Sequence, residues 1–218
     1  MRTELVAIVV AAAGALGCAS ATSLCTARNL AEGETQLGVG LKAPWPVAEV
    51  GIRRGLTDRI ELGAQGGGFV SRPLTMVSAL ADVKAQLHRA ATPNVGWDLA
   101  LDPSVGYESF EATGAPIRSV NGGLALLVGH GIGNGHQVVL GPRMIESLLW
   151  DANSEPTWVP SWGASLAVAF AVSNRVQLIP ECTVMYSPVT YNTKQGIPMA
   201  QCALGVLVGN GPGDAAQR

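Results

Sequence analysis

Three histidines have the widest chemical range in this sequence, because imidazole can act as a general base or bind a metal. They are His88, His130 and His136. Two of them lie close together in the chain, but two ligands without a third do not make a metal site. Asp102 and Glu108 form a carboxylate pair that could do acid–base work, although packing inside the protein explains them equally well. We predict no catalytic residue and no metal.

A glycine-rich stretch separates His130 from His136. Residues 131–135 read Gly-Ile-Gly-Asn-Gly, which resembles a fragment of a dinucleotide-binding fingerprint. Such a fingerprint requires a helix directly after the glycines, because the N-terminus of that helix holds the pyrophosphate. No helical pattern follows here, so we predict that the protein has no cofactor.

The four cysteines are Cys18, Cys25, Cys182 and Cys202. If Cys18 is modified, as considered below, three remain. Cys182 and Cys202 fall on two adjacent predicted strands with the same facing, and a turn centred on Asn192 would place them opposite one another. We predict that they are cross-strand neighbours. They could be disulfide-bonded or could serve as small apolar side chains.

The charged residues of the predicted strands share one facing and carry both signs. A five-residue turn at 55–59 would place Arg53 opposite Glu61, and a loop at 89–93 would place Lys84 opposite Asp98. Opposite charges at such positions stabilise a sheet. We therefore predict an internal charge network of Glu49, Arg53, Glu61, Asp82, Lys84, Asp98, Asp102, Arg143 and Glu181.

The elements that position these residues are alternating strands. In residues 47–69 apolar and polar residues alternate on both sides of a short turn, a pattern typical of a hairpin with one apolar face. The same pattern continues along the chain. We predict about ten strands: residues 34–41, the two strands of 47–69, and then 77–88, 94–108, 119–129, 137–150, 157–171, 176–186 and 197–208.

Composition separates this chain from most soluble domains. Its 218 residues are 48% hydrophobic and only 14% charged, and the formal net charge is −2. Mean hydropathy is +0.28, yet no apolar run reaches the roughly 18 residues of a membrane helix. Strands with a lipid-facing apolar side would explain both features, and a soluble β-protein with a large core is the alternative. The charge offers no footprint for nucleic acid.

The N-terminus has the features of an export signal. Arg2 precedes a short apolar region at residues 5–16. The following Gly17 and Cys18 resemble a bacterial lipobox, although Ala15 departs from its preferred leucine. The resemblance implies a signal peptide at 1–17 and a lipid-anchor or lead-in segment at 18–33 that begins at Cys18. Ordinary cleavage after Ala21 is the alternative. The alternating strands predict a β-barrel domain at 34–208, and the Gly, Pro and polar residues after it predict a flexible tail at 209–218.

The strand pattern over residues 34–208 resembles bacterial outer-membrane β-barrels. These have an even number of antiparallel strands, short periplasmic turns and longer outer loops. In this chain the connectors after every second predicted strand are also the shorter ones. The resemblance implies an all-β, closed, up-and-down transmembrane barrel, with membrane lipid and the barrel-assembly and export machinery as partners. The chain departs from the family pattern at its end, because the last strand lacks a terminal aromatic residue.

Two features favour a membrane barrel over a soluble one with an inward apolar face. The polar face is rich in small residues and poor in charge, which suits a crowded lumen. Aromatic residues also gather at the loop ends of the strands, as in an interfacial girdle. The girdle residues are Trp45, Tyr107, Trp150, Trp158, Trp162 and Tyr186.

These expectations define the function only broadly. We predict an outer-membrane envelope protein with a structural or surface role, or a narrow passive channel. Ion pairs can fill a lumen this narrow, and an open pore lined by the same charges is the alternative. Some barrels of this class are enzymes with sites on the loop side, but the histidines here fall on the turn side, so we predict no enzyme. A soluble periplasmic lipoprotein barrel that binds an apolar ligand is the second possibility.

Overall fold

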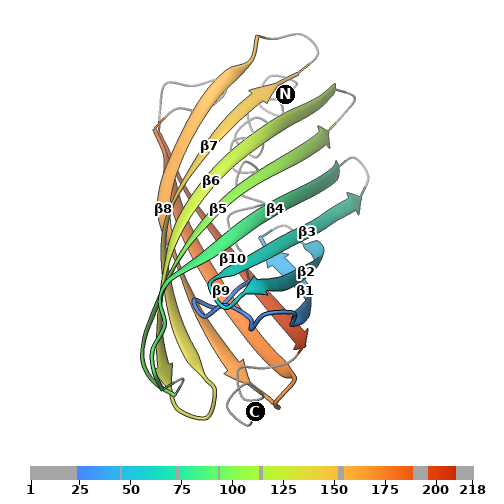
Figure 1. Cartoon of the computed structure of the whole chain (residues 1–218). Coiled ribbons are helices and arrows are strands. Elements are labelled where there is room, and N and C mark those ends of the chain that lie inside the picture. The colour runs from blue at the N-terminus through green and yellow to red at the C-terminus, as the bar shows by residue number, and fades with distance from the viewer. Residues whose placement is uncertain are drawn as a thin grey trace.

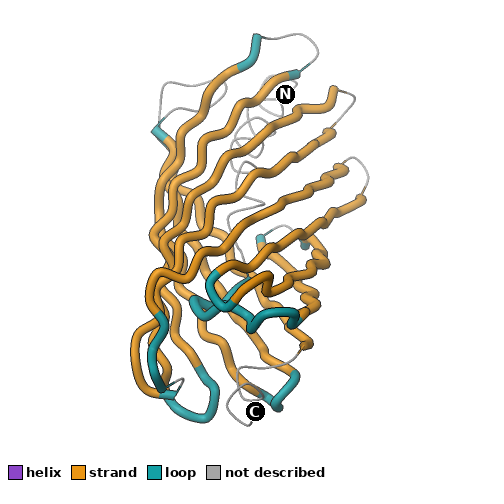
Figure 2. The backbone as a smooth tube through the Cα atoms, in the orientation of Figure 1, coloured by secondary structure: helices purple, strands orange, loops and turns teal. Residues whose placement is uncertain are grey.

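The computed structural model describes residues 24–44, 46–71, 74–92, 94–112, 115–151, 155–188 and 196–209. Most of the described residues are in strands, and the described loops and turns are short (Figure 2). No helix among these residues is long and apolar enough to span a bilayer.

Ten antiparallel strands form one closed barrel (Figure 1). Each strand pairs with its neighbours in sequence, and β1 closes the sheet by pairing with β10. The predicted all-β, closed, up-and-down barrel of ten strands is therefore confirmed. The strands are β1 (Thr35–Ala43), β2 (Val47–Thr57), β3 (Ile60–Ser71), β4 (Leu74–His88), β5 (Val95–Ala112), β6 (Ala115–Ile132), β7 (Gln137–Trp150), β8 (Thr157–Ala171), β9 (Val176–Ser187) and β10 (Ile197–Gly209).

The predicted bounds of β7 and β8 match the structure, whereas several other strands run further than their sequence pattern. β3 ends at Ser71 and β4 begins at Leu74, and β5 and β6 approach one another as closely. Most of the loops predicted at 71–75 and 111–116 therefore belong to strands. As a result, the predicted alternation of shorter and longer connectors is wrong for these two hairpins.

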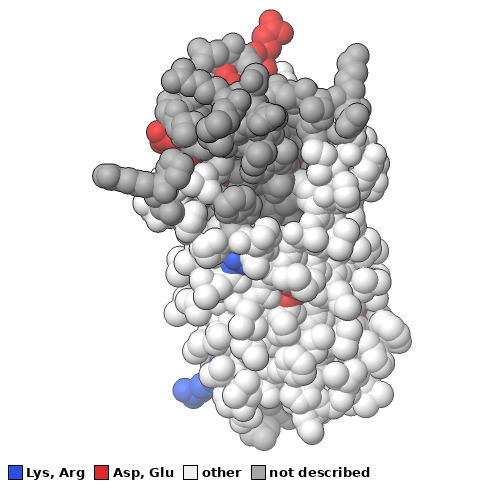
Figure 3. Space-filling model, turned by 180° about the vertical axis from the view of Figure 1, so that it is seen from behind, with Lys and Arg blue, Asp and Glu red and all other residues white. Residues whose placement is uncertain are grey.

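The two faces of the wall differ in polarity as the alternation predicted. Many large apolar side chains on the outer face are 40% exposed or more, while most of the charged side chains of the strands point inward and are buried. On β2, for example, Val50 and Ile52 face outward and Glu49 and Arg53 face inward. Figure 3 shows the rear of the barrel as a broad uncharged wall with isolated charged side chains.

The rim of the barrel is lowest at the hairpin of β1 and β2. These strands have 9 and 11 residues, whereas β5 and β6 have 18 each. In Figure 1 the β1–β2 hairpin ends well below the hairpins of β5 to β8. The last pair between β1 and β10 joins Ala43 to Cys202, so residues 197–201 of β10 extend beyond β1.

The outward aromatic residues lie mainly towards the loop ends of the strands. Tyr107, Trp158, Trp162 and Tyr186 are exposed there, and Trp150 is half-buried at the end of β7. Trp45 lies outside the described residues. Two further aromatic residues of the loop ends, Phe69 and Phe110, belong to an inward-facing cluster rather than to the outer surface.

Candidate functional site

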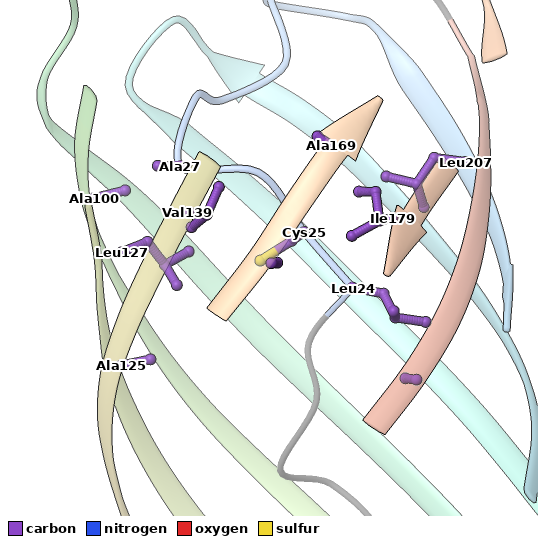
Figure 4. Packing of buried hydrophobic residues seen from close by; sticks show 12 residues of the cluster. Leu24, Cys25, Ala27, Ala100, Ala125, Leu127, Val139, Ala169, Ile179 and Leu207 are labelled. Carbon is purple, nitrogen blue, oxygen red and sulfur yellow. The ribbon is translucent and has the colours of Figure 1, made fainter. Parts of the chain in front are cut away.

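The lumen contains a segment of the chain's own N-terminal region. Residues 24–30, which we call the plug, lie inside the barrel, and the turn at residues 31–34 connects them to β1. Figure 4 shows Leu24, Cys25 and Ala27 surrounded by side chains that point inward from several strands. The expected lead-in before the barrel is thus, from residue 24, part of its interior.

Small residues of the wall make room for the plug. A β-carbon at Gly205 would lie 3.0 Å from the Leu24 side chain, and one at Gly129 would lie 2.7 Å from Ala27 Cβ. The apolar core around the plug is correspondingly built largely from alanines. Its members on the wall are Ala100, Ala125, Leu127, Val139, Ala167, Ala169, Ile179, Ala203 and Leu207.

Four backbone N–H groups of the plug donate to four side chains of the wall. Leu24 N donates to Glu181 Oε2 at 2.9 Å and Ala27 N to Gln137 Oε1 at 3.0 Å. Asn29 N donates to Gln86 Oε1 at 2.7 Å, and Leu30 N donates to Glu61 Oε2 at 2.8 Å. The acceptors come from β9, β7, β4 and β3, so the segment is attached on several sides of the lumen. Buried backbone groups need such partners, since leaving them unpaired is costly.

The carbonyl groups of the plug are bonded in the same way. Lys84 Nζ donates to Thr26 O at 3.1 Å and to Arg28 O at 3.3 Å. Gln86 Nε2 donates to Ala27 O at 3.1 Å. Gln86 therefore accepts from one plug residue and donates to another, as a strand partner would.

An ion pair fixes the centre of the plug. Arg28 Nε and the Asp98 carboxylate lie 3.2 Å apart, and Arg28 NH2 also donates to Ala90 O at 2.9 Å. Asp98 accepts further hydrogen bonds from Gln137 Nε2 at 2.8 Å and from Ala90 N at 3.0 Å. Both charged groups are buried, so their stability depends on this complete set of partners.

A second charge cluster lies beside the plug. Arg53 NH1 contacts Glu61 at 3.1 Å and Asp82 at 2.9 Å, and its NH2 donates to the other oxygen of Asp82 at 2.9 Å. Lys84 Nζ lies 3.0 Å from Glu61. Glu61 thus bonds two cations and the Leu30 amide, so the plug and the wall charges form one network.

Two more ion pairs lie on other sides of the lumen. Lys42 pairs with Glu49, and Arg143 NH2 lies 3.3 Å from Glu181 Oε1. Glu181 therefore joins Arg143 to the first amide of the plug. Asp102 lines a small cavity near Asp82 and Arg143.

All nine residues of the predicted charge network face the lumen and are buried. The predicted register of the first hairpin is nevertheless wrong, because Arg53 lies opposite Gly63 rather than Glu61. β2 continues to Thr57, and the Thr57 Oγ1 accepts hydrogen bonds from Arg59 N and Ile60 N, so the turn is tighter than predicted. The register of the two strands shifts between Gly55 and Thr57, just before this turn. The Arg53 side chain reaches Glu61 diagonally.

The predicted pairing of Lys84 with Asp98 is also wrong. The pairing of β4 with β5 places Ala85 opposite Leu101 and shifts between Gln86 and His88. Asp98 therefore lies closer to the turn, where it accepts from Ala90 N and binds Arg28. Lys84 binds Glu61 instead.

Sequence reasoning missed two cations of the network, Arg28 and Lys42. A signal for Lys42 was present, because the alternation of β1 places it on the same face as Gln36. For Arg28 the signal was weaker: it is the only charged residue between Glu4 and Glu32. Its aspartate partner lies 70 positions further along the chain.

Glu108, the predicted carboxylate partner of Asp102, faces the lumen and is buried, whereas the cysteine and histidine candidates on the strands and turns lie away from the lumen. Cys182 and Cys202 are opposite one another on β9 and β10, form a disulfide, and face outward. His88, His130 and His136 lie at the turn side of the barrel, where His130 stacks on Trp97 with ring centroids 4.5 Å apart. Within the described ranges, no group of three or more His, Cys, Asp or Glu side chains could hold a metal. Cys18 lies outside the described residues.

The chain matches no protein-family model and no curated protein sequence. Among solved structures it is similar to the N-terminal β-barrel domain of Pseudomonas aeruginosa OprF, with 12% identity, a TM-score of 0.39, and coverage of 83% of this chain and 99% of that one. The translocator domain of the autotransporter NalP from Neisseria meningitidis gives 13% identity, a TM-score of 0.38, and coverage of 80% and 86%. Neisserial surface protein A gives 12% identity, a TM-score of 0.23, and coverage of 80% of this chain and 94% of that one.

Proposed function

We propose that the protein is a bacterial outer-membrane barrel with a structural role, whose lumen is closed by its own N-terminal segment. The observation that carries this proposal is the attachment of four plug amides to side chains of β3, β4, β7 and β9. A segment attached on several sides of a narrow lumen leaves little room for a solute.

The polarity of the two faces supports a membrane location. A soluble barrel covers its outside with charged side chains and turns its apolar face inward. Here the outer face carries exposed leucines, valines and tryptophans, and the buried charges face the lumen. Lipid is the environment in which this distribution is stable, because the outer side chains can then leave water. The same distribution argues against a soluble barrel with an apolar ligand throughout its interior.

The membrane location implies export, so we also expect a signal peptide to be removed at Cys18 or after Ala21. Leu24 lies in the lumen only six positions after Cys18. Six extended residues span at most about 20 Å. A lipid on Cys18 would therefore be attached within about 20 Å of Leu24.

Conductance in planar bilayers tests the closed lumen. Protein whose unboiled gel mobility shows a folded barrel should be electrically silent. Replacing Glu61 and Asp98 together by alanine removes acceptors for Leu30 and Arg28, and should produce intermittent conductance. Asp58→Ala, in an exposed turn, is the matched control and should remain silent. Steady conductance of the unmodified protein would support the open pore and exclude this proposal.

Extraction tests the membrane location separately. Folded protein should stay in the membrane fraction in salt and in carbonate, and should be released by detergent. Release by salt alone would contradict the membrane proposal whatever the conductance shows.

A further inference from the structure

Charge is distributed unevenly around the turn side of the barrel. Three turns there join β4 to β5, β6 to β7 and β8 to β9. These turns and the strand ends beside them, residues 87–97, 130–137 and 170–177, contain no Asp or Glu. They do contain five side chains that are cationic or become so on protonation. We call these five residues the basic arc: His88, Arg89, His130, His136 and Arg175.

The other part of the turn side carries both signs. Arg54 and Arg59 are exposed at the β2–β3 hairpin, where Asp58 is the direct neighbour of Arg59. Glu32 and Glu34 lie in the turn before β1, which is hydrogen-bonded to β2. Opposite charges this close together reduce the field that reaches the surroundings.

The two arginines of the basic arc are not neutralised in this way. Arg175 is exposed and Arg89 is half-buried. Among the residues that the structure describes, no carboxylate lies within ion-pair distance of either guanidinium group. Asp98, the nearest carboxylate along the chain from Arg89, faces the lumen and binds Arg28. The positive charge of the arc is therefore available to an external anion.

Hydrogen bonds join the three turns of the arc into one surface. Gly133 N donates to Asn94 O at 2.9 Å, and Gly135 N donates to Asn94 Oδ1 at 3.0 Å. Ala171 N donates to His136 Nδ1 at 3.0 Å. All three turns lie at the lower end of the barrel in Figure 1. Their cations are thus held along one side of the rim rather than on independent loops.

Exposed apolar side chains lie directly beside these cations. Trp97, Phe170 and Val172 are 60%, 41% and 68% exposed. The His130 ring stacks on Trp97 with centroids 4.5 Å apart, and the His136 ring meets Phe170 with centroids 5.9 Å apart. A water-soluble anion would leave the apolar side chains in water, whereas a phospholipid presents phosphate and hydrocarbon side by side.

We propose that the basic arc binds the phosphate head groups of anionic phospholipids. Arg89 and Arg175 supply the charge, and Trp97 and Phe170 contact the region where the acyl chains begin. Anionic head groups attract Arg and Lys side chains that lie near a membrane surface. The proposal rests on the membrane location proposed above and adds a lipid preference, which is confined to the side of the barrel formed by β4 to β9.

Native mass spectrometry of the folded full-length protein in detergent tests this preference. The probes are palmitoyl-oleoyl phosphatidylglycerol and palmitoyl-oleoyl phosphatidylcholine, which have the same acyl chains and differ in head-group charge. The Kd for phosphatidylglycerol should be lower by about tenfold or more, the effect of two cations near an anionic head group. Raising the salt from about 0.1 M to about 1 M should reduce the difference, because the Debye length falls from about 10 Å to about 3 Å.

Substitutions locate the site. Arg89→Gln together with Arg175→Gln should raise the Kd for phosphatidylglycerol about 30-fold, since each arginine contributes about fivefold. The Kd for phosphatidylcholine should stay within about twofold. Arg54→Gln together with Arg59→Gln is the matched control, because it removes two exposed arginines from the other part of the turn side. Its Kd for phosphatidylglycerol should change less than about twofold.

Arg175→Gln alone, in an exposed turn, keeps the test usable if the double variant does not fold. It should raise the Kd for phosphatidylglycerol about fivefold. Unboiled gel mobility verifies folding of every variant.

Four outcomes would overturn the proposal. Equal Kd values for the two lipids, in a protein that stays in carbonate-washed membranes, would reject the lipid preference alone. An equal loss of affinity in the arc and control variants would show attraction all around the rim. Displacement of phosphatidylglycerol by millimolar glycerol phosphate would identify a soluble phosphate ligand instead. Release of the folded protein by salt would reject the membrane location itself.

Discussion

The ion pair between Arg28 and Asp98 is expected to hold the plug in place, and a double-mutant cycle measures how strongly. Arg28→Met removes the cation and leaves a buried carboxylate with Gln137 and Ala90 as its remaining partners. Breaking a buried pair from one side typically costs about 3–5 kcal/mol, because the other charge stays buried without compensation. Asp98→Asn should cost a similar amount. It removes the counter-charge and one of the two carboxylate oxygens to which Arg28 donates, so the Arg28 cation stays buried without a neutralising partner.

The double variant should be less unstable than the sum of the single variants. Removing both charges at once leaves no uncompensated ion, so we expect a coupling of about 2 kcal/mol, within the range for residues in one network. The free energy of unfolding in denaturant, followed by tryptophan fluorescence of the detergent-folded protein, provides the values. Alkylation of Cys25, which is buried in the plug, should also become faster in each single variant.

Asp58 and Arg59 provide the control cycle, because both lie in the exposed turn between β2 and β3. Asp58→Asn and Arg59→Met should each change stability by less than about 0.5 kcal/mol, as surface substitutions usually do. Additive costs for Arg28→Met and Asp98→Asn, with no change in Cys25 alkylation, would refute the role assigned to this pair.

Three other predictions concern the wall. The disulfide should leave Cys182 and Cys202 unlabelled by a thiol reagent unless a reductant is added, and labelling of both without reductant would exclude the bond. Replacing both by serine should lower the unfolding free energy by about 3 kcal/mol, the chain-entropy value for their separation of 20 residues; an unchanged midpoint would contradict this. Gly163→Ala should destabilise the barrel by about 1–3 kcal/mol, because the new methyl group would meet the Val184 carbonyl, whereas Gly122→Ala has open space and should change stability little; equal effects in denaturant would show that the close approach is not limiting.

The sequence predicted the barrel well because alternation has a period of two and each strand has only two faces. Once Val50 and Ile52 are assigned outward, Glu49 and Arg53 must face inward, whatever the neighbouring strand does. Pairing between strands is a separate question. It depends on turn geometry, and a single shift near Gly55 moved Arg53 from Glu61 to Gly63. The predicted ion pair between Arg53 and Glu61 is present despite the wrong register, because the long Arg53 side chain still reaches Glu61.

The plug could not be predicted in the same way. Residues 24–30 have no alternation, because they form no strand and bond to side chains rather than to a neighbouring backbone. Their partners lie between 31 and 157 positions further along the chain. Local sequence patterns carry no information on such contacts. Only the inward polar residues without an evident partner, such as Gln86 and Gln137, indicated that the lumen held something to bond.

The plug explains why glycines stand at several inward positions of the strands. Gly40 and Gly205 face Leu24, and a β-carbon at either position would contact its side chain. Gly55 faces the carbonyls of Leu30 and Ala31, where a β-carbon would meet backbone atoms. In a barrel without a plug these inward positions could carry larger residues, which would fill the lumen and pack better in a strand. The small residues of the wall and the plug therefore depend on each other. Small side chains stand at the wall positions where plug atoms fill the lumen, and polar side chains of the wall form hydrogen bonds with the plug backbone.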